Sequence, residues 1–371
     1  MKAVVAVAAA FALMSGLAVA QTAAPAVKAP ATTAAKPAAA KPAAAKPKTA
    51  AKPAPVEAAA AEPPAPVILE PLANSLQAYA SFQQDIDLVN GGSIQNPRDI
   101  ERALDKAAAM NRDQLTRGYI AYGAMTAARS EKFVAEVRKV AAAYGKERVM
   151  KALVNNYRYA GTIDGGSEAA EFVARVAASD SQRVVSAGEK VKTRAREAQN
   201  LAWGKALAGP AAPRTTRLKT AAASAKGGTV NAEVTERLKI VPGSGSPLTD
   251  PVSFGGDNFW TMLNGKAPPE ATLTSLPVQA KALTFTSESG GSAIRGAMLS
   301  LAAMYALDAT MDDAQTTNTL LNNNLTNGCL QRAQLQFYQC VASARFNYEN
   351  MACVGEAGLI TVGGCFGDAS K

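Results

Sequence analysis

The residues best placed to do chemistry in this sequence are four cysteines near its end, Cys329, Cys340, Cys353 and Cys365. A thiol can act as a nucleophile or a metal ligand, but an even set of cysteines in an exported protein normally forms disulfides. The sequence contains no histidine, so it lacks the commonest partner of a catalytic or zinc-binding thiol. We therefore expect two disulfides and no reactive or metal-binding cysteine.

The spacing of these cysteines predicts how they pair. If one helix carries both Cys329 and Cys340, their Cα atoms lie about 16 Å apart, whereas a disulfide allows only about 7 Å. In an antiparallel helical hairpin, residues that face each other across the turn have the same midpoint in residue number. Cys340 with Cys353 and Cys329 with Cys365 both centre near Asn347, where a turn is plausible. The sequence therefore predicts two nested disulfides, provided that both arms of the hairpin are regular.

Carboxylates are the other side chains that could support catalysis. Glu131, Glu147, Glu168 and Glu171 all lie near expected helix starts, where an acidic group simply complements the helix dipole, and Glu288 lies in a Gly/Ser-rich stretch. The sequence has no nucleophile elbow and no phosphate-binding loop, and without histidine it cannot assemble the usual triads or zinc sites. It therefore predicts no catalytic, cofactor-binding or metal-binding residue and no cofactor. A carboxylate-dependent peptidoglycan hydrolase remains an alternative, because glycan cleavage needs no histidine.

The first 20 residues have the three parts of a secretory signal peptide. Lys2 supplies the charged start, an apolar run extends from Ala3 to about Leu17, and the small residues 18–20 precede Gln21. We expect cleavage before Gln21. The alternative is an uncleaved anchor, because the apolar run approaches the roughly 20 residues that span a bilayer. Alanine and valine dominate this run, and they favour insertion less than leucine does.

Residues 21–66 form an Ala/Pro/Lys-rich linker. Lys-Pro steps recur at Lys36, Lys41, Lys46 and Lys52. A proline every five or six residues prevents a helix from propagating, so this segment is predicted to be a disordered spacer.

Residues 67–207 are predicted to form a helical bundle. Leu72, Leu76, Tyr79, Phe82 and Ile86 recur at three- and four-residue steps, which places them on one face of a helix. Further helices are expected from Pro97, after an Asn96 cap, and from Asn111, and then over 130–144, 147–159, 167–178 and 181–207. About 135 residues are enough chain to bury a core.

Residues 208–292 are rich in Gly, Pro, Ser and Thr, and they are expected to be a linker or a surface excursion without long helices. Phe254, Phe259 and Trp260 nevertheless lie close together, which is unusual for a disordered chain. These three aromatic residues either dock onto the helical body or form a contact patch for a ligand.

Residues 293–371 return to a helical pattern and contain the four cysteines. A break is expected at about 316–324, and a following helix should bury Leu330, Leu335, Tyr338 and Val341. A free hairpin of this size buries little apolar area, so we expect it to pack on the 67–207 bundle. The predicted fold class is all-α: an irregular multi-helix bundle with a disulfide-linked C-terminal helical hairpin, preceded by the disordered linker.

The charge of the chain limits its partners. The net charge is +9, but Lys190, Lys192, Arg194 and Arg196 spread around their helix and form no stripe that would suit nucleic acid. We expect a non-catalytic, periplasmic envelope protein that binds another envelope protein or peptidoglycan and keeps no integral membrane segment after cleavage. The N-terminally anchored, periplasm-spanning form is the remaining alternative.

Overall fold

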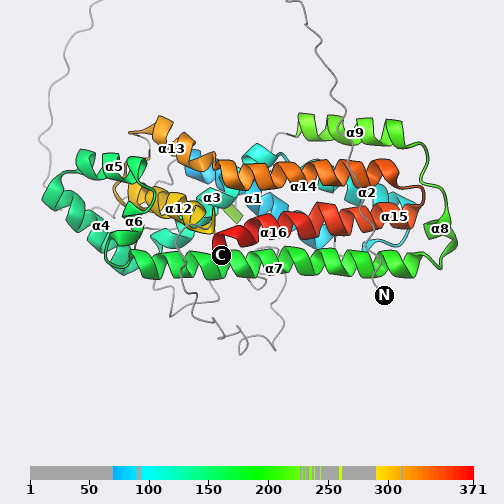
Figure 1. Ribbon diagram of the computed structural model, residues 1–371, viewed down its shortest axis with the longest axis horizontal. Helices are drawn as coiled ribbons and strands as arrows, with labels where there is room; N and C mark the ends of the chain where they lie inside the picture. Colours follow the sequence, from blue (N-terminus) through cyan, green and yellow to red (C-terminus); the bar gives the residue numbers. More distant parts are fainter. Residues whose placement is uncertain are drawn as a thin grey trace, which may run out of the picture. The chain divides into compact units, whose positions relative to one another are not determined.

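A computed structural model describes residues 70–89, 93–225, 290–310 and 312–371, together with residues 228, 230, 234, 235, 238, 243, 259 and 260. All of them belong to one compact unit, residues 63–371. In this part of the chain every regular element is a helix, and one isolated antiparallel bridge joins Leu207 and Phe346. The predicted all-α class is therefore confirmed (Figure 1).

The helices follow one another in a simple order along the chain. They are α1 (Glu70–Leu88), α2 (Pro97–Ala108), α3 (Arg112–Ala128), α4 (Glu131–Tyr144), α5 (Lys146–Asn155), α6 (Tyr159–Thr162), α7 (Gly166–Ala198), α8 (Ala202–Lys205), α9 (Ala211–Ser224), α12 (Gly290–Ala306), α13 (Ala314–Leu321), α14 (Asn324–Ser343), α15 (Asn347–Cys353), the π-helix η2 (Val354–Ile360), α16 (Thr361–Gly367) and the 3₁₀ helix η3 (Asp368–Ser370).

Local sequence signals explain where several of these helices begin. The Asn96 side chain accepts hydrogen bonds from the backbone N–H groups of Arg98 and Asp99, and the Asp99 carboxylate accepts a hydrogen bond from the Asn96 backbone N–H. This reciprocal capping box starts α2, with Pro97 in the first helical position. At the start of α3, the Asn111 side chain accepts hydrogen bonds from the backbone N–H groups of Asp113 and Gln114. The predicted Asn96 cap and the predicted helix start at Asn111 are confirmed.

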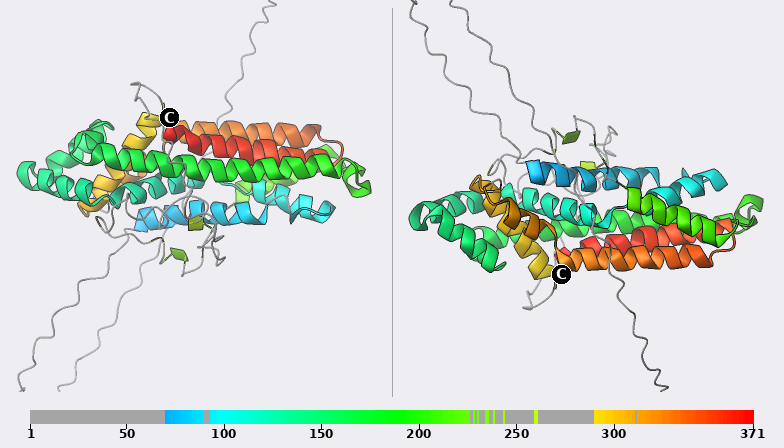
Figure 2. Two further views of the ribbon diagram at one scale, coloured as in Figure 1. Left: turned by 90° about the horizontal axis from the view of Figure 1, so that it is seen from below. Right: turned by 90° about the horizontal axis from the view of Figure 1, so that it is seen from above.

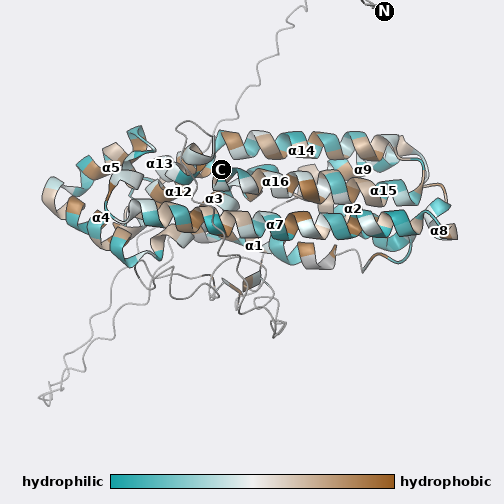
Figure 3. Cartoon of the chain, turned by 60° about the horizontal axis from the view of Figure 1, so that its bottom comes forward, coloured by the Kyte–Doolittle hydropathy of each residue, from teal (hydrophilic) through white to brown (hydrophobic). Residues whose placement is uncertain are grey.

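The core lies where α1, α3, α7, α12 and the C-terminal helices meet. The predicted stripe of α1, from Leu72 to Ile86, is buried. Helix α3 packs between α1 and α12, and α7 runs beside α15, η2 and α16, as Figures 1 and 2 show from three directions. Helix α3 is buried around most of its circumference, while polar residues cover the outer faces of helices such as α2 and α7 (Figure 3).

Helix α7 approaches the C-terminal helices very closely because glycines meet at the contact. A Cβ atom on Gly188 would lie 2.7 Å from the Gly355 carbonyl oxygen, and one on Gly355 would lie 2.8 Å from the Gly188 oxygen. No side chain fits at either position. The two backbones are therefore in direct contact, and any larger residue there would push α7 and η2 apart.

Several sequence expectations are wrong, among them the helix predicted over 147–159, which ends at Asn155, and the burial of Tyr338, which is only partly buried. The break predicted between residues 178 and 181 is absent, because Asp180 and Ser181 hydrogen-bond to other parts of the fold instead of capping a new helix. Helix α9 forms inside the stretch where no long helix was expected, and α13 forms where a break was expected. Leu335 is 53% exposed, because Ala333 and Phe337 occupy the buried face of α14 in its place.

Candidate functional site

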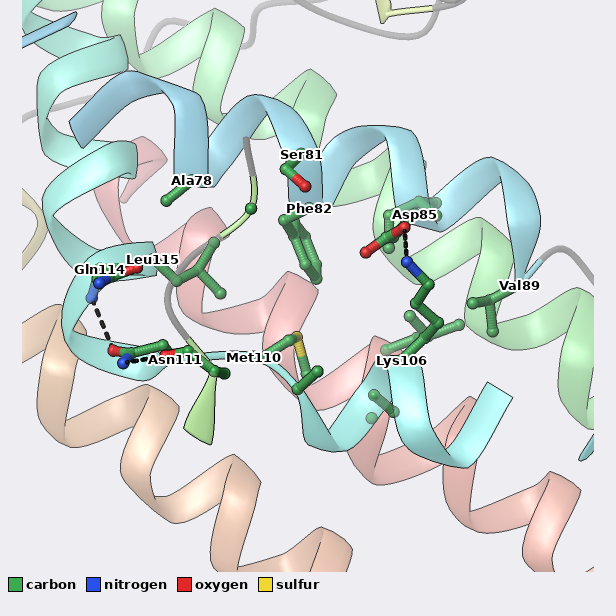
Figure 4. Close-up of a pocket in the computed structure, with 17 residues that line it drawn as sticks. Ala78, Ser81, Phe82, Asp85, Val89, Lys106, Met110, Asn111, Gln114 and Leu115 are labelled. Atoms are coloured by element: carbon green, nitrogen blue, oxygen red, sulfur yellow. Dashed lines mark hydrogen bonds and ion pairs between the residues drawn. The ribbon is translucent and has the colours of Figure 1, made fainter. Parts of the chain in front are cut away.

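An apolar pocket lies between α1, the end of α2, the start of α3 and the π-helix η2 (Figure 4). Its volume is about 270 Å³, close to the lower end of about 300 Å³ for small-molecule sites. Its lining residues come from distant parts of the sequence and are mostly apolar: Ala78, Ser81, Phe82, Asp85, Ile86, Val89, Lys106, Ala107, Ala109, Met110, Asn111, Gln114, Leu115, Ala225, Gly228, Gly358 and Leu359.

Helical periodicity places the wall that α1 contributes. Ala78, Phe82, Asp85 and Val89 recur at three- and four-residue steps and so share one face. In Figure 4, Phe82, Leu115 and Met110 surround the centre of the pocket from three directions. Because these side chains belong to separate segments, the pocket exists only when all of them are packed together.

Polar groups line the edge of the pocket. Lys106 and Asp85 form an ion pair of 2.8 Å at one end, and both side chains are partly exposed. At the other end, the Asn111 oxygen caps α3 while its amide donates to the Ala225 carbonyl oxygen at 3.1 Å. The pocket therefore has apolar walls and an edge whose two opposite charges cancel.

A second, much smaller cavity of about 20 Å³ lies next to the first. Ala107, Met110, Leu115 and Gly358 line both cavities and therefore form the partition between them. The remaining walls of the small cavity include Leu330 and Phe337 of α14.

A buried polar network lies behind the pocket wall. Asp180 of α7 is fully buried and accepts hydrogen bonds from the Tyr79 hydroxyl at 2.9 Å and from the Trp260 indole at 3.0 Å. Gln83 donates to the Tyr79 hydroxyl, and Arg183 donates to Gln83 at 2.7 Å. The network ties residue 260 to α1 and α7, and buried polar groups need such partners because they are costly to leave unpaired.

Aromatic rings surround this network. Tyr79 lies 5.1 Å from the Tyr122 ring and 5.3 Å from the Phe366 ring, measured between centroids. Burial, followed by the charge of Asp180, raises the pKa of the Tyr79, Tyr119 and Tyr122 hydroxyls well above the usual value. These tyrosines therefore stay neutral at physiological pH, where they act as hydrogen-bond donors and core-filling groups.

The predicted cysteine pairs are confirmed. Cys329 is bonded to Cys365 and Cys340 to Cys353, each with 5.6 Å between the Cα atoms. No cysteine is free. The disulfides join α14 to the arm formed by α15, η2 and α16, and that arm carries Gly358 of the pocket wall.

The other sequence candidates do not gather at one place. Phe259 and Trp260 are buried in the core, as the docking alternative expected, whereas Phe254 lies outside the described residues. The four acidic candidates Glu131, Glu147, Glu168 and Glu171 are exposed on α4, α5 and α7, and Glu288 lies outside the described residues. Among described residues, no group of three or more potential metal ligands occurs.

Sequence reasoning did not find the pocket. The sequence shows apolar residues at three- and four-residue steps along α1, but this spacing indicates a core face and a pocket wall equally well. The one suggestive signal is Met110, a flexible apolar residue at a predicted helix junction.

Comparisons with protein-family models, with curated proteins and with solved structures found no match to this chain. Within the described residues, no helix combines the length and the apolar character needed to cross a membrane.

Proposed function

We propose that this chain is a non-catalytic, exported binding protein of the cell envelope, located in the periplasm of a diderm bacterium, and that the 270 Å³ pocket holds its ligand. The pocket is the observation that carries the proposal. It is concave, mostly apolar and built on helices from four parts of the chain, which are the usual properties of a small-molecule site.

The physical basis of binding is burial of apolar surface. Transfer of an apolar group from water contributes about 0.8 kcal/mol per methylene group. The walls around Phe82, Leu115 and Met110 offer that environment, and the Asp85–Lys106 pair adds no net charge at the edge. An apolar or amphiphilic ligand therefore suits the site better than a strongly charged one.

Export supports the envelope location. The first 20 residues match a signal peptide, and two disulfides join the C-terminal helices, which suits an oxidising compartment. The sequence of residues 21–66 predicts a Lys-Pro spacer, and we propose that another envelope protein or peptidoglycan holds this spacer while the helical body binds its ligand.

An uncharged naphthylamine dye that fluoresces in apolar surroundings tests the pocket. The oxidised full-length mature protein should bind it, and Ala78→Phe should weaken binding by at least about tenfold, because the added ring occupies the pocket. Ala135→Phe is the matched control, since Ala135 is exposed on α4 and far from the lining residues in the sequence. Equal dye binding by Ala78→Phe and the unchanged protein would contradict the proposal.

Two further measurements test the envelope role. N-terminal sequencing of the protein from cells should begin at Gln21, and a start at Met1 would support the anchored alternative instead. Incubation with labelled peptidoglycan should release no soluble fragment. Release at a rate abolished by one Asp or Glu substitution would show a hydrolase.

A further inference from the structure

We propose that the ligand is a single unbranched alkyl chain, which enters the 270 Å³ pocket and places its terminal methyl end in the small cavity beyond Met110. This inference rests on the proposed function and adds to it the chemical class of the ligand and the residues that limit its length.

The sizes of the two cavities favour a narrow molecule. One water-sized group, such as a methylene group, needs at least about 10–15 Å³ of cavity volume, so the main pocket of about 270 Å³ accepts a chain of many methylene groups. The second cavity, of about 20 Å³, has room for about one. A ring or a branched chain does not fit a space of that size, whereas the end of an alkyl chain does.

Two residues in the partition decide whether a chain can pass. Met110 is partly buried, and its unbranched thioether can change rotamer at little cost. Gly358 has no side chain, and a Cβ atom there would lie 3.3 Å from the Ala107 Cβ and 3.7 Å from the Phe337 ring. The passage therefore depends on a mobile side chain on one side and on a missing one on the other.

The edge of the main pocket suits the polar end of the ligand. Asp85 and Lys106 neutralise each other at 2.8 Å, and each can also hydrogen-bond a head group. Ser81 and Gln114 line the same pocket, and their hydroxyl and amide groups can hydrogen-bond a head group as well. An amphiphile can therefore bury its chain and leave its head in water beside these groups.

The experiment measures affinity against chain length. Saturated n-alkanoates and n-alkyl phosphocholines of about six to about sixteen carbons displace the naphthylamine dye from the oxidised mature protein, below the concentrations at which they form micelles. Affinity should rise about fourfold for each added methylene group until both cavities are filled, and then stop rising. Both series should show this limit, and the tighter series identifies whether the natural chain belongs to a free acid or to a lipid with a zwitterionic head.

Two substitutions with opposite effects test the partition. Gly358→Ala adds a methyl group at the passage and should lower the affinity of the longer chains by about tenfold without changing that of the short ones. Met110→Ala removes the other obstacle and should raise the affinity of the longer chains by several-fold. The control is Gly364→Ala on the same helical arm, because a Cβ atom at Gly364 meets nothing within 4 Å.

The outcomes separate this inference from the proposed function. If the dye binds in the pocket but no chain of any length displaces it, the alkyl-chain inference is wrong and the proposed function stands, whereas equal dye binding by Ala78→Phe and the unchanged protein overturns both. If chains bind but the affinity limit is the same in the unchanged protein, Gly358→Ala and Met110→Ala, the pocket binds ligands and the passage past Met110 is wrong.

Discussion

Cys353 and Cys365 face the same neighbouring helix, α14, although twelve positions separate them on one continuous helical arm. In a regular α-helix, twelve residues at about 100° each would turn Cys365 about 120° away from Cys353. An ideal π-helix has about 4.4 residues per turn, so the seven residues of η2 remove about 120° of rotation and bring the two cysteines back onto the same face. On α14, Cys329 and Cys340 are eleven positions apart, which is close to three whole turns.

This relationship predicts that η2 contains one residue more than a regular α-helix would need to place Cys353 and Cys365 on the face toward α14. Deletion of Glu356, which is exposed on η2, should convert the segment to α-helix and keep both disulfides, since the two arms then have equal spacing. Peptide mapping without reduction and a free-thiol assay measure the pairing. Deletion of exposed Arg332 from α14 is the control, and it should leave free or mispaired thiols because Cys340 turns about 80° away. Loss of the pairs in the Glu356 deletion would contradict the interpretation.

Arg214 should stabilise the junction between α9 and the end of α14. Its guanidinium is buried and donates to four backbone oxygens, including those of Val341 at 2.9 Å and Ala344 at 2.8 Å. Arg214→Met should lower the free energy of unfolding by about 3 kcal/mol, because the carbonyl groups lose charged donors. Arg217→Met, on the same helix, removes only exposed ion pairs and should cost less than about 1 kcal/mol. Urea denaturation followed by circular dichroism compares them, and similar losses would refute this role of Arg214.

Trp260 should hold its segment to the core through Asp180. Trp260→Phe keeps an aromatic ring but removes the indole donor 3.0 Å from the buried carboxylate. We therefore expect the free energy of unfolding to fall by about 1–3 kcal/mol. Trp203→Phe is the control, because Trp203 is only partly buried and stacks with Arg194 at 5.8 Å. Circular dichroism must report the transition, since both variants change the fluorescence. A smaller loss for Trp260→Phe than for Trp203→Phe would be the contrary result.

Alkaline pH should destabilise the fold through its buried tyrosines. Burial, followed by the charge of Asp308, raises the pKa of Tyr305 to about 12 from an ordinary value of 10.0. The folded state therefore keeps the proton longer than the unfolded state, and this contribution is complete below pH 10 and lost as the pH rises towards 12. Ionisation of Tyr305 lowers the free energy of unfolding by at most about 3 kcal/mol. The raised pKa values of Tyr79, Tyr119 and Tyr122 also lower it as the pH rises.

Thermal melts at intervals between about pH 8 and pH 12 measure this dependence, in a range set by the tyrosine pKa values. Tyr305→Phe should flatten the decline, whereas Tyr144→Phe, at a residue that is 64% exposed, should leave it unchanged. A melting temperature that stays constant through this range would show that the buried hydroxyls do not couple to unfolding.

The sequence by itself determined the features that depend on neighbouring residues. The stripe from Leu72 to Ile86, the Asn96 cap, the helix start at Asn111 and the all-α class follow from spacing along one helix or from contacts within four residues. The disulfide pairs were also predictable, because the cysteine positions share a midpoint. That prediction assumed two equally regular helical arms. The second arm is not regular, and the π-helix η2 is what brings Cys353 and Cys365 to positions that face Cys340 and Cys329.

Tertiary structure decided the features whose partners are distant in the sequence. The sequence predicts a break between residues 178 and 181, but α7 continues through Asp180, whose buried carboxylate accepts hydrogen bonds from Tyr79 and Trp260. The pocket likewise needs walls from α1, α3 and η2 at once. The sequence of any one of these segments does not show that the three pack against one another. The physical reason is that periodicity shows which face of a helix is apolar, whereas the packing of several helices decides whether that face is filled by another side chain or left open for a ligand.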